Sequence, residues 1–216
     1  RRQRQMCIRD SEETTQYAPW PMSAPWLLNQ LYDHYLYITD EEYKNRILPM
    51  FEICLAFYKD FLVEHNGKLV TCPSISPENK FKDVGTSACI TYMPSMDREL
   101  LYEFFANCRE LGLETPEIEQ VKPASDGRIP EYAEEFGETE VEHRHVSHLY
   151  CIYPARIPAS NELNLAAEKS LLKRGFGGTG WSLGWKVCLW ARLKNGENAY
   201  LSLIHISEPT RQEAIS

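Results

Sequence analysis

Residues 41–62, EEYKNRILPMFEICLAFYKDFL, decide the class of the fold. Apolar side chains recur there every three or four positions, which is the period of one helix face. The stripe consists of Met50, Phe51, Cys54, Leu55, Tyr58, Phe61 and Leu62. Thr39-Asp-Glu-Glu42 has the capping-box pattern, in which Thr39 accepts from a helix amide while Glu42 reaches back. We expect Pro49 to interrupt or restart this helix and Asn66-Gly67 to supply its left-handed C-cap.

Outward from this stretch, four more segments have a helical period. The predicted helices cover about residues 25–37, 98–111, 161–174 and 181–194. Asp97 is the expected cap of the second of these, and glycines are the expected helix ends. Strand signals are few, and the best candidates are Lys68–Cys72 and Ala88–Tyr92. Helical hairpins joined by long loops predict an all-α toroid or bundle rather than a mixed sheet fold.

Composition places the chain among globular proteins, with 216 residues, 43% hydrophobic and 25% charged. The formal net charge of -8 argues against a nucleic-acid partner, because phosphate binding requires a concentrated basic surface. No run approaches the roughly 18 apolar residues of a membrane span, so we expect no membrane partner. The seven cysteines form no CxxC pair, and we interpret them as buried thiols rather than a disulfide framework or a zinc site.

The two ends of the chain differ from the rest. Residues 1–10 (RRQRQMCIRD) and 203–216 (LIHISEPTRQEAIS) show no amphipathic period continuous with their neighbours. We interpret both as adapter-derived or disordered tails and exclude them from function. The genuine protein is then expected to run over residues 11–202, as a fragment of a larger domain.

Pro73-Ser-Ile-Ser-Pro-Glu-Asn79 is the first segment that could carry chemistry. Its prolines keep the backbone extended, because each one also excludes its predecessor from the helical region. This stiff loop presents Glu78 and Asn79 side by side. A carboxyl group on a partly apolar loop suits a general acid, since burial favours the protonated form of a carboxyl group. The alternative is an ordinary solvated turn, which this segment alone does not exclude.

His143-Arg-His-Val-Ser-His148 holds half of the six histidines. Imidazoles can bind a metal ion, polarise a hydroxyl group or orient a neighbouring acid. The HxHxxH spacing suits a metal only if a carboxylate or a fourth imidazole joins from elsewhere. The guanidinium group of Arg144 can bind sugar hydroxyls or a carboxylate. The segment therefore predicts a functional site whose chemistry stays open.

Gly175-Phe-Gly-Gly-Thr-Gly-Trp-Ser182 does not predict a phosphate loop, because the GK[ST] ending is missing and no strand precedes it. We interpret the tryptophans of this region mainly as core residues: Trp181, Trp185 and Trp190. Trp20 and Trp26 stand beside prolines instead. They are expected to line a pocket, because loop aromatics are not committed to a core.

Taken in order, these segments resemble family 95 glycoside hydrolases, the α-L-fucosidase family. The resemblance rests on WPMSAPWL (20–27), LYDHY (31–35), PSISPEN (73–79), MD (96–97), HRHVSHLY (143–150) and TGWSLGWK (179–186). These six blocks occur in the family's order and cover about residues 19–200. The SPEN, HRHxSHLY and TGWSxxWK patterns are each distinctive.

The resemblance implies a catalytic domain built as an (α/α)6 toroid, of which this chain is a central part. It implies an inverting exo-glycosidase that releases terminal α-L-fucosyl (or α-L-galactosyl) residues from glycans, with no metal or other cofactor. Glu78 matches the family's general acid, and Arg144 and His145 match its sugar-contacting pair. Further candidate sugar contacts are Asn79, His148, Trp20 and Trp26.

The family's base is an asparagine activated by an aspartate, in an Asn-rich segment and a PFQIDGNFG-like segment that do not occur in this sequence. We therefore expect the chain to be inactive on its own. The resemblance also suggests a secreted or periplasmic location, although no secretory signal pattern follows the N-terminal arginines.

Two other classes of function stay open at this point. The first is a metal-dependent hydrolase that uses His143, His145 and His148, which stoichiometric zinc or manganese would support. The second is a non-catalytic carbohydrate-binding helical module. Such a module would still bind sugar after Glu78→Gln, with no catalytic loss.

Overall fold

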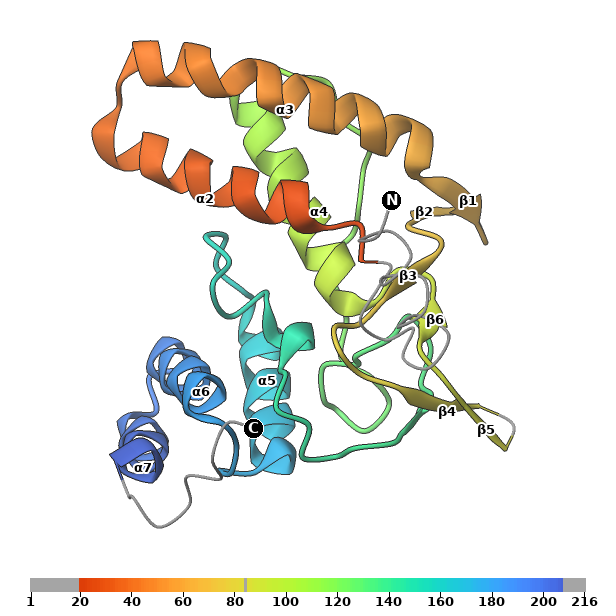
Figure 1. The fold of residues 1–216 in the computed structure, drawn as a ribbon, viewed down its shortest axis with the longest axis vertical. Coiled ribbons are helices and arrows are strands. Elements are labelled where there is room, and N and C mark those ends of the chain that lie inside the picture. Colours follow the sequence, from red (N-terminus) through yellow and green to blue (C-terminus); the bar gives the residue numbers. More distant parts are fainter. Residues whose placement is uncertain (1–19, 84, 208–216) are drawn as a thin grey trace, which may run out of the picture.

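The computed structural model describes residues 20–83 and 85–207, and these residues form mainly helices. Two helical parts lie one above the other in Figure 1. The first part holds α2 (Ser23–Ile38), α3 (Glu41–Phe61) and α4 (Ser95–Glu110). The second part holds α5 (Asn161–Arg174), α6 (Gly180–Arg192) and α7 (Gly196–Ser207). This helix-rich structure fits the predicted all-α class in part, since the described residues also include short strands, and α5 matches its predicted bounds.

Short strands lie on one side of the molecule, at the right in Figure 1. They are β1 (Val63–His65), β2 (Lys68–Val70), β3 (Ser74–Ile75), β4 (Phe81–Asp83), β5 (Thr86–Ala88), β6 (Ile90–Thr91) and β7 (Gly137–Glu138). All their pairings are antiparallel: β1 with β2, β3 with β6, and a three-stranded sheet in the order β5-β4-β7. The β3–β6 pair matters most for function, because Ser74 pairs with Thr91 at the start of the loop that carries Glu78.

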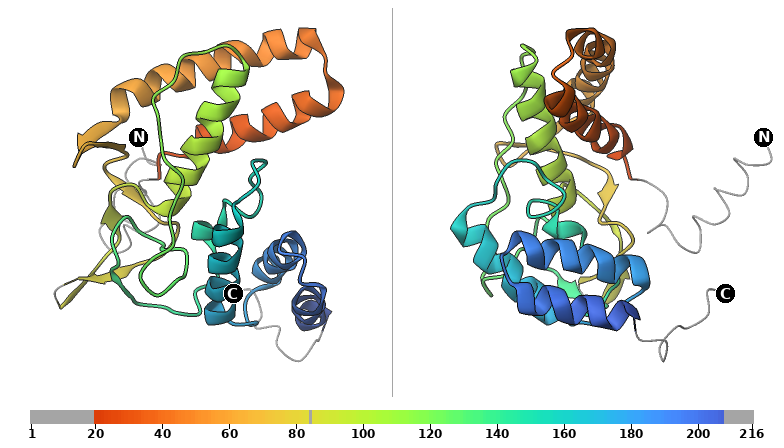
Figure 2. Two further views of the ribbon diagram at one scale, coloured as in Figure 1. Left: turned by 180° about the vertical axis from the view of Figure 1, so that it is seen from behind. Right: turned by 90° about the vertical axis from the view of Figure 1, so that its left-hand side faces the viewer.

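Each helical part has its own apolar core. In the first, the ring of Phe51 from α3 stacks on Phe104 from α4 at 5.5 Å. In the second, Trp190 of α6 is buried beside α5 and stacks on Phe176 at 6.3 Å. The extended segment after α4 runs back along that helix and connects the two parts (Figure 2). None of the described helices combines the length and hydropathy that crossing a bilayer requires.

The start of α3 corrects the capping prediction. Thr39 adopts the left-handed conformation (φ 48°) and closes α2, with its N–H donated to the carbonyl oxygen of Tyr35. It is therefore not available to cap α3. Asp40 takes that position instead, and its carboxylate accepts from the N–H of Glu42 at 2.8 Å. An aspartate at the N-cap satisfies one of the free amides of the first turn.

Two further predictions, a break of the helix at Pro49 and a C-cap at Asn66-Gly67, were wrong. Pro49 lies inside a continuous α3, because the buried stripe on either side packs against α2 and α4. That packing outweighs a cost of roughly 3 kcal/mol for an internal proline. Asn66 (φ 52°) and Gly67 (φ 73°) form the two-residue turn between β1 and β2 rather than a helix cap. Hairpin turns of this kind need the same left-handed conformation that a C-cap needs, so the dipeptide alone did not distinguish them.

The prediction for Asp97 was also wrong, since α4 begins at Ser95 with Pro94 as its N-cap. Asp97 is buried within the first turn and accepts hydrogen bonds from the Thr71 hydroxyl at 2.7 Å and the indole N–H of Trp20 at 3.2 Å. Burial raises the pKa of its carboxyl group to about 7. At the other end of α4, Gly112 has a positive φ of 86°, as expected for a helix end.

At the C-terminal side, α7 continues through Ser207 and so includes the first residues of the predicted tail at 203–216. The predicted tail at residues 1–10 lies outside the described residues.

Candidate active site

Glu78 lies where two segments far apart in the sequence meet. Its Oε2 atom is 2.5 Å from a guanidinium nitrogen of Arg144 and 3.3 Å from Nε2 of His145. The loop after β3 supplies the glutamate, and the segment before the short 3-10 helix η2 (Ser147–Leu149) supplies its partners. The Glu78 side chain keeps 34% of its surface exposed, so an external ligand can reach this group. The loop of residues 73–79 (the acid loop) and the segment of residues 143–148 (the histidine segment) therefore converge.

The loop and the histidine segment are tied to each other and to α6. The Ser147 hydroxyl donates to the carbonyl oxygen of Pro77 at 2.8 Å, next to Glu78. The Ser182 hydroxyl, in the first turn of α6, donates to the carbonyl oxygen of Arg144 at 2.5 Å. These two bonds fix the backbone next to Glu78 and the backbone of Arg144.

The glycine-rich segment brings α6 close to this group. Lys186 is buried, and its ammonium group donates to the carbonyl oxygens of Gly175 at 2.9 Å and Gly177 at 2.7 Å. Burial, and then Arg174 nearby, lowers the pKa of Lys186 to about 8. Gly178 has a φ of 148°, which L side chains rarely adopt, and a Cβ atom there would lie 3.1 Å from the Ser182 hydroxyl oxygen. Glycine is therefore favoured where the chain turns into α6.

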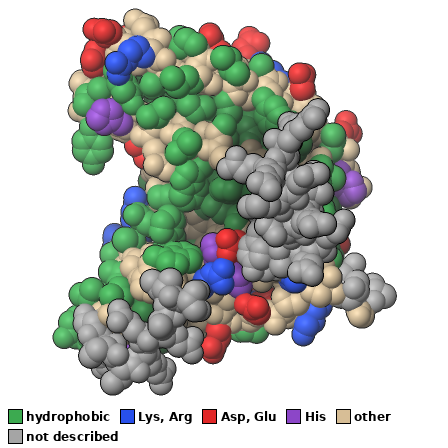
Figure 3. Space-filling view, in the orientation of Figure 1, with side chains coloured by type: hydrophobic (Ala, Val, Ile, Leu, Met, Phe, Trp, Pro, Cys, Tyr) green, Lys and Arg blue, Asp and Glu red, His purple; other side chains and the backbone are tan. Residues whose placement is uncertain are grey.

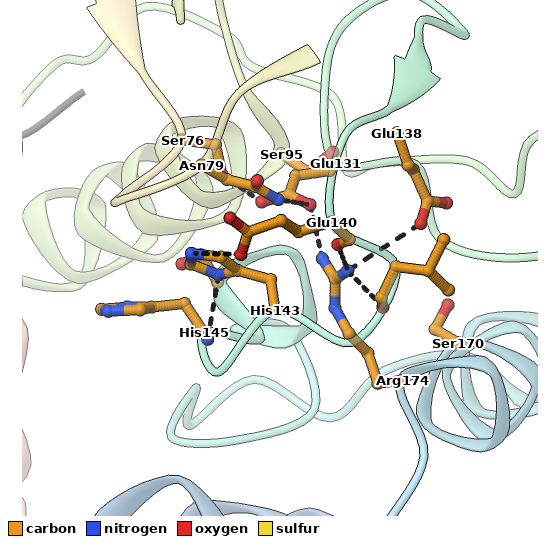
Figure 4. Close-up of polar contacts among 12 residues, drawn as sticks. Ser76, Asn79, Ser95, Glu131, Glu138, Glu140, His143, His145, Ser170 and Arg174 are labelled. Atoms are coloured by element: carbon orange, nitrogen blue, oxygen red, sulfur yellow. Dashed lines mark hydrogen bonds and ion pairs between the residues drawn. The ribbon is translucent and has the colours of Figure 1, made fainter. Parts of the chain in front are cut away.

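A buried ion pair between Glu131 and Arg174 lies next to the loop that carries Glu78 (Figure 4). The carboxylate of Glu131 accepts from the Ser76 hydroxyl at 2.8 Å, the Asn79 amide at 2.9 Å and the Arg174 guanidinium at 2.6 Å. Burial by itself would raise the pKa of Glu131, but the charge of Arg174, with His148 and the two hydrogen bonds, holds it below its usual value. Glu131 is therefore an ionised group in the interior of the protein.

The three histidines have different surroundings. His145 is half-buried beside Glu78, and burial lowers its pKa although the glutamate acts in the opposite direction. Nδ1 of His143 accepts from the backbone N–H of His145 at 3.1 Å. His148 is only 3% exposed, and burial together with Arg174 lowers its pKa to about 4. Among the described residues, no three His, Cys, Asp or Glu side chains form a group that could hold a metal ion.

The other predicted contacts are buried or half-buried. Asn79 is 3% exposed, with its amide group turned to Glu131. Trp20 is half-buried and donates to Asp97, as described above. Trp26 lies in α2 rather than in a loop and stacks on Trp185 of α6 at 6.2 Å, which joins the two helical parts. Contact of these side chains with a sugar stays a prediction.

Figure 3 shows a hollow between the α2–α4 part and the α5–α7 part. Acidic, basic and histidine side chains gather along one side of this hollow, and hydrophobic side chains line its interior. Such a mixture of charged and apolar surface suits a polar ligand that also has apolar faces.

The sequence profile of the glycosyl hydrolase family 95 catalytic domain matches residues 4–215. The chain belongs to this family. Alpha-L-fucosidase 2 of Arabidopsis thaliana is 38% identical over 211 residues, covering 88% of this chain and 25% of the relative. Probable alpha-fucosidase A of Aspergillus niger is 26% identical over 223 residues, covering 89% of this chain and 28% of the relative. The family 95 chain thus spans about a quarter of the length of these relatives.

Three residues of this candidate site were not predicted as site residues. Trp181 was interpreted as core, but it is 51% exposed and its ring contacts that of His145 edge-on at 4.9 Å. Its position at the first turn of a glycine-flanked helix was the signal that could have found it. Glu131 and Arg174 gave no local signal, because a buried ion pair between a loop and a helix end is formed only by the tertiary fold.

Proposed function

We propose that this chain supplies the acid side of a fucosidase-type glycosidase, with Glu78 as the general acid. The observation that supports it is the convergence of Glu78, Arg144 and His145 in a chain of family 95. Two curated relatives are named as α-fucosidases, and a third, from Aspergillus oryzae, carries the same name as the A. niger protein. The substrate class that we propose is a glycan with a terminal α-L-fucosyl residue.

In the proposed reaction, the carboxyl group of Glu78 donates its proton to the glycosidic oxygen as the bond from that oxygen to the anomeric carbon breaks. Water attacks the anomeric carbon from the opposite face and gives up a proton to a base there, so the configuration inverts. Both contacts of Glu78 fall on Oε2. We therefore propose that Oε1 faces the leaving oxygen, while Arg144 and His145 stay on the other oxygen or turn to sugar hydroxyls.

Arg144 and His145 are proposed to contact the sugar directly. A guanidinium group presents a planar set of N–H donors that suits neighbouring hydroxyl groups. The exposed indole of Trp181 beside His145 offers an apolar face for the C–H side of a pyranose ring. Asn79 is buried and its amide donates to Glu131, so we propose that it supports the acid loop, while sugar contact by Asn79 or by the buried His148 stays a prediction.

The base is proposed to come from other segments of a longer protein. In an inverting enzyme the two catalytic groups lie roughly 6.5–9.5 Å apart, with the water between them. The base segments expected for this family do not occur in the 216 residues. We therefore propose that the chain alone does not hydrolyse glycosides, and that α2–α7 form part of an (α/α)6 toroid when the rest of the catalytic domain is present.

The experiment is a chimera in which this chain replaces the matching segment of the Arabidopsis relative. The chimera is expected to release L-fucose from a fucosylated oligosaccharide, and Glu78→Gln is expected to lower kcat by roughly 10²–10⁴-fold, the usual contribution of a general acid. The matched control is Glu64→Gln, an exposed glutamate on β1. An active chimera whose turnover is unchanged by Glu78→Gln contradicts the acid assignment.

Binding and chemistry are separated by a second measurement on the same proteins. The Glu78→Gln chimera should still bind the oligosaccharide, because Arg144 and His145 remain. If the unsubstituted chimera binds sugar without hydrolysing it, the non-catalytic carbohydrate-binding function is supported instead.

A further inference from the structure

The buried pair of Glu131 and Arg174 has a feature that ordinary core ion pairs lack. It bonds both segments that form the site, and it does so close to the reactive groups. On one side, the Glu131 carboxylate accepts from Ser76 and Asn79, which lie two residues before and one residue after Glu78. These two bonds leave little freedom to the backbone that carries the candidate acid.

On the other side, Arg174 bonds the backbone of the segment that precedes the histidines. Its guanidinium group donates to the carbonyl oxygens of Glu140 at 3.0 Å and Val141 at 2.8 Å. Arg144 follows only three residues after Val141. Because one guanidinium group bonds both Glu131 and this backbone, it links the acid loop and the histidine segment through a single side chain (Figure 4).

The pair is itself fixed in place. The backbone carbonyl oxygen of Glu131 accepts from the N–H of Ser95, the first residue of α4, at 3.1 Å. Arg174 is the last residue of α5 and its side chain is 4% exposed. Both charges are therefore anchored to rigid helices, which is the arrangement that keeps a site geometry within narrow limits.

We propose that Glu131 and Arg174 are positioning residues that set Glu78 against Arg144 and His145. This rests on the proposed function only in that Glu78 is the acid; the geometry that the pair maintains is a property of the chain itself. Neither residue touches the substrate. Their role is to keep the Glu78 carboxylate within hydrogen-bond reach of its two partners.

The test measures this geometry directly, through the titration of the His145 ring by NMR in the 216-residue chain. Glu78 raises the pKa of His145 by its charge and its contact. Glu78→Gln should therefore lower the pKa of His145 in the wild-type chain. In a Glu131→Gln background the same substitution should produce no shift, because the acid loop no longer holds position 78 beside the imidazole.

Two further variants keep the outcome decisive. Glu135→Gln removes an exposed carboxyl group from the same loop, which bonds only Ser125 among the described residues, and should retain the full response of His145 to Glu78→Gln. If Glu131→Gln does not fold, the double variant Ser76→Ala/Asn79→Ala releases the acid loop while leaving the Glu131–Arg174 pair intact. This double variant should also lose the response.

The proposal is overturned if either folded variant keeps the wild-type response, or if Glu78→Gln leaves the titration of His145 unchanged in the wild-type chain. L-fucose is added in a parallel NMR titration. A chain that shows the expected His145 responses but no binding of L-fucose would count against the proposed sugar site and leave the positioning role intact.

Discussion

Arg174→Met is the substitution whose effect on stability can be worked out most fully. The variant leaves the Glu131 carboxylate buried without its cation and removes two donors from the carbonyl oxygens of Glu140 and Val141. Removing one partner of a buried ion pair usually costs about 3–5 kcal/mol. That is a large fraction of the roughly 5–15 kcal/mol that stabilises a folded domain.

The cost should depend on pH in a defined direction. In the wild-type chain the folded-state pKa of Glu131 lies below its unfolded value, so its contribution is present above about pH 4.5 and lost as pH falls through the folded pKa. Without the guanidinium group, burial raises the folded pKa above the unfolded one. The variant is then stabilised by protonation, and the difference in unfolding free energy between the two proteins should shrink from pH 7.5 to pH 4.5.

Urea unfolding followed by tryptophan fluorescence measures this difference. With a slope of about 2 kcal/mol per molar urea, a cost of about 4 kcal/mol moves the midpoint by about 2 M at pH 7.5. Lys173→Met is the matched control, since its exposed ion pair with Glu138 contributes about 0–1 kcal/mol. A cost below about 1 kcal/mol for Arg174→Met, or one that grows on acidification, would refute the reasoning.

Three more substitutions test other buried groups. Burial lowers the folded pKa of His148 to about 4, so the wild-type chain should lose about 3 kcal/mol of unfolding free energy as pH falls from 6.5 to 4. His148→Gln should abolish this loss. Urea midpoints across this pH range measure it, and a variant with the same pH dependence as the wild-type chain contradicts it. Asp97→Asn should stabilise the chain by up to about 4 kcal/mol at pH 8 but not at pH 4, because burial raises the folded pKa of Asp97 to about 7. The resulting cost to the wild-type chain builds up as pH rises from about 4 to about 7 and stays constant above that. Equal shifts in thermal midpoint at both pH values would argue against this. Phe104→Ala should cost about 3–5 kcal/mol of unfolding free energy, because it leaves a cavity in the core of the α2–α4 part. Phe57→Ala, on the exposed side of α3, should cost less than half as much. Similar urea midpoints for the two variants would be inconsistent with the packing.

Local chemistry explains which fold predictions succeeded. The helix at Asn161–Arg174 was predicted with its bounds, because Ser160 caps it and Gly175 ends it within a few residues of sequence. Dipeptides that suit two different local structures were predicted less well. Asn66-Gly67 suits a helix end and a hairpin turn equally, and only the pairing of β1 with β2 decides between them.

Periodicity, capping and motif spacing are local properties of the chain. The order of amino acids is therefore enough to predict the helical stripes and to name Glu78, Arg144 and His145 as candidate site residues. Folding in three dimensions brings these three side chains together, and it pairs Glu131 with Arg174, 43 residues further along the chain, in the interior beside them. The reason is physical: a charge becomes stable in the interior only when folding brings its partner within hydrogen-bond reach, and no pattern of neighbours in the sequence encodes that partner.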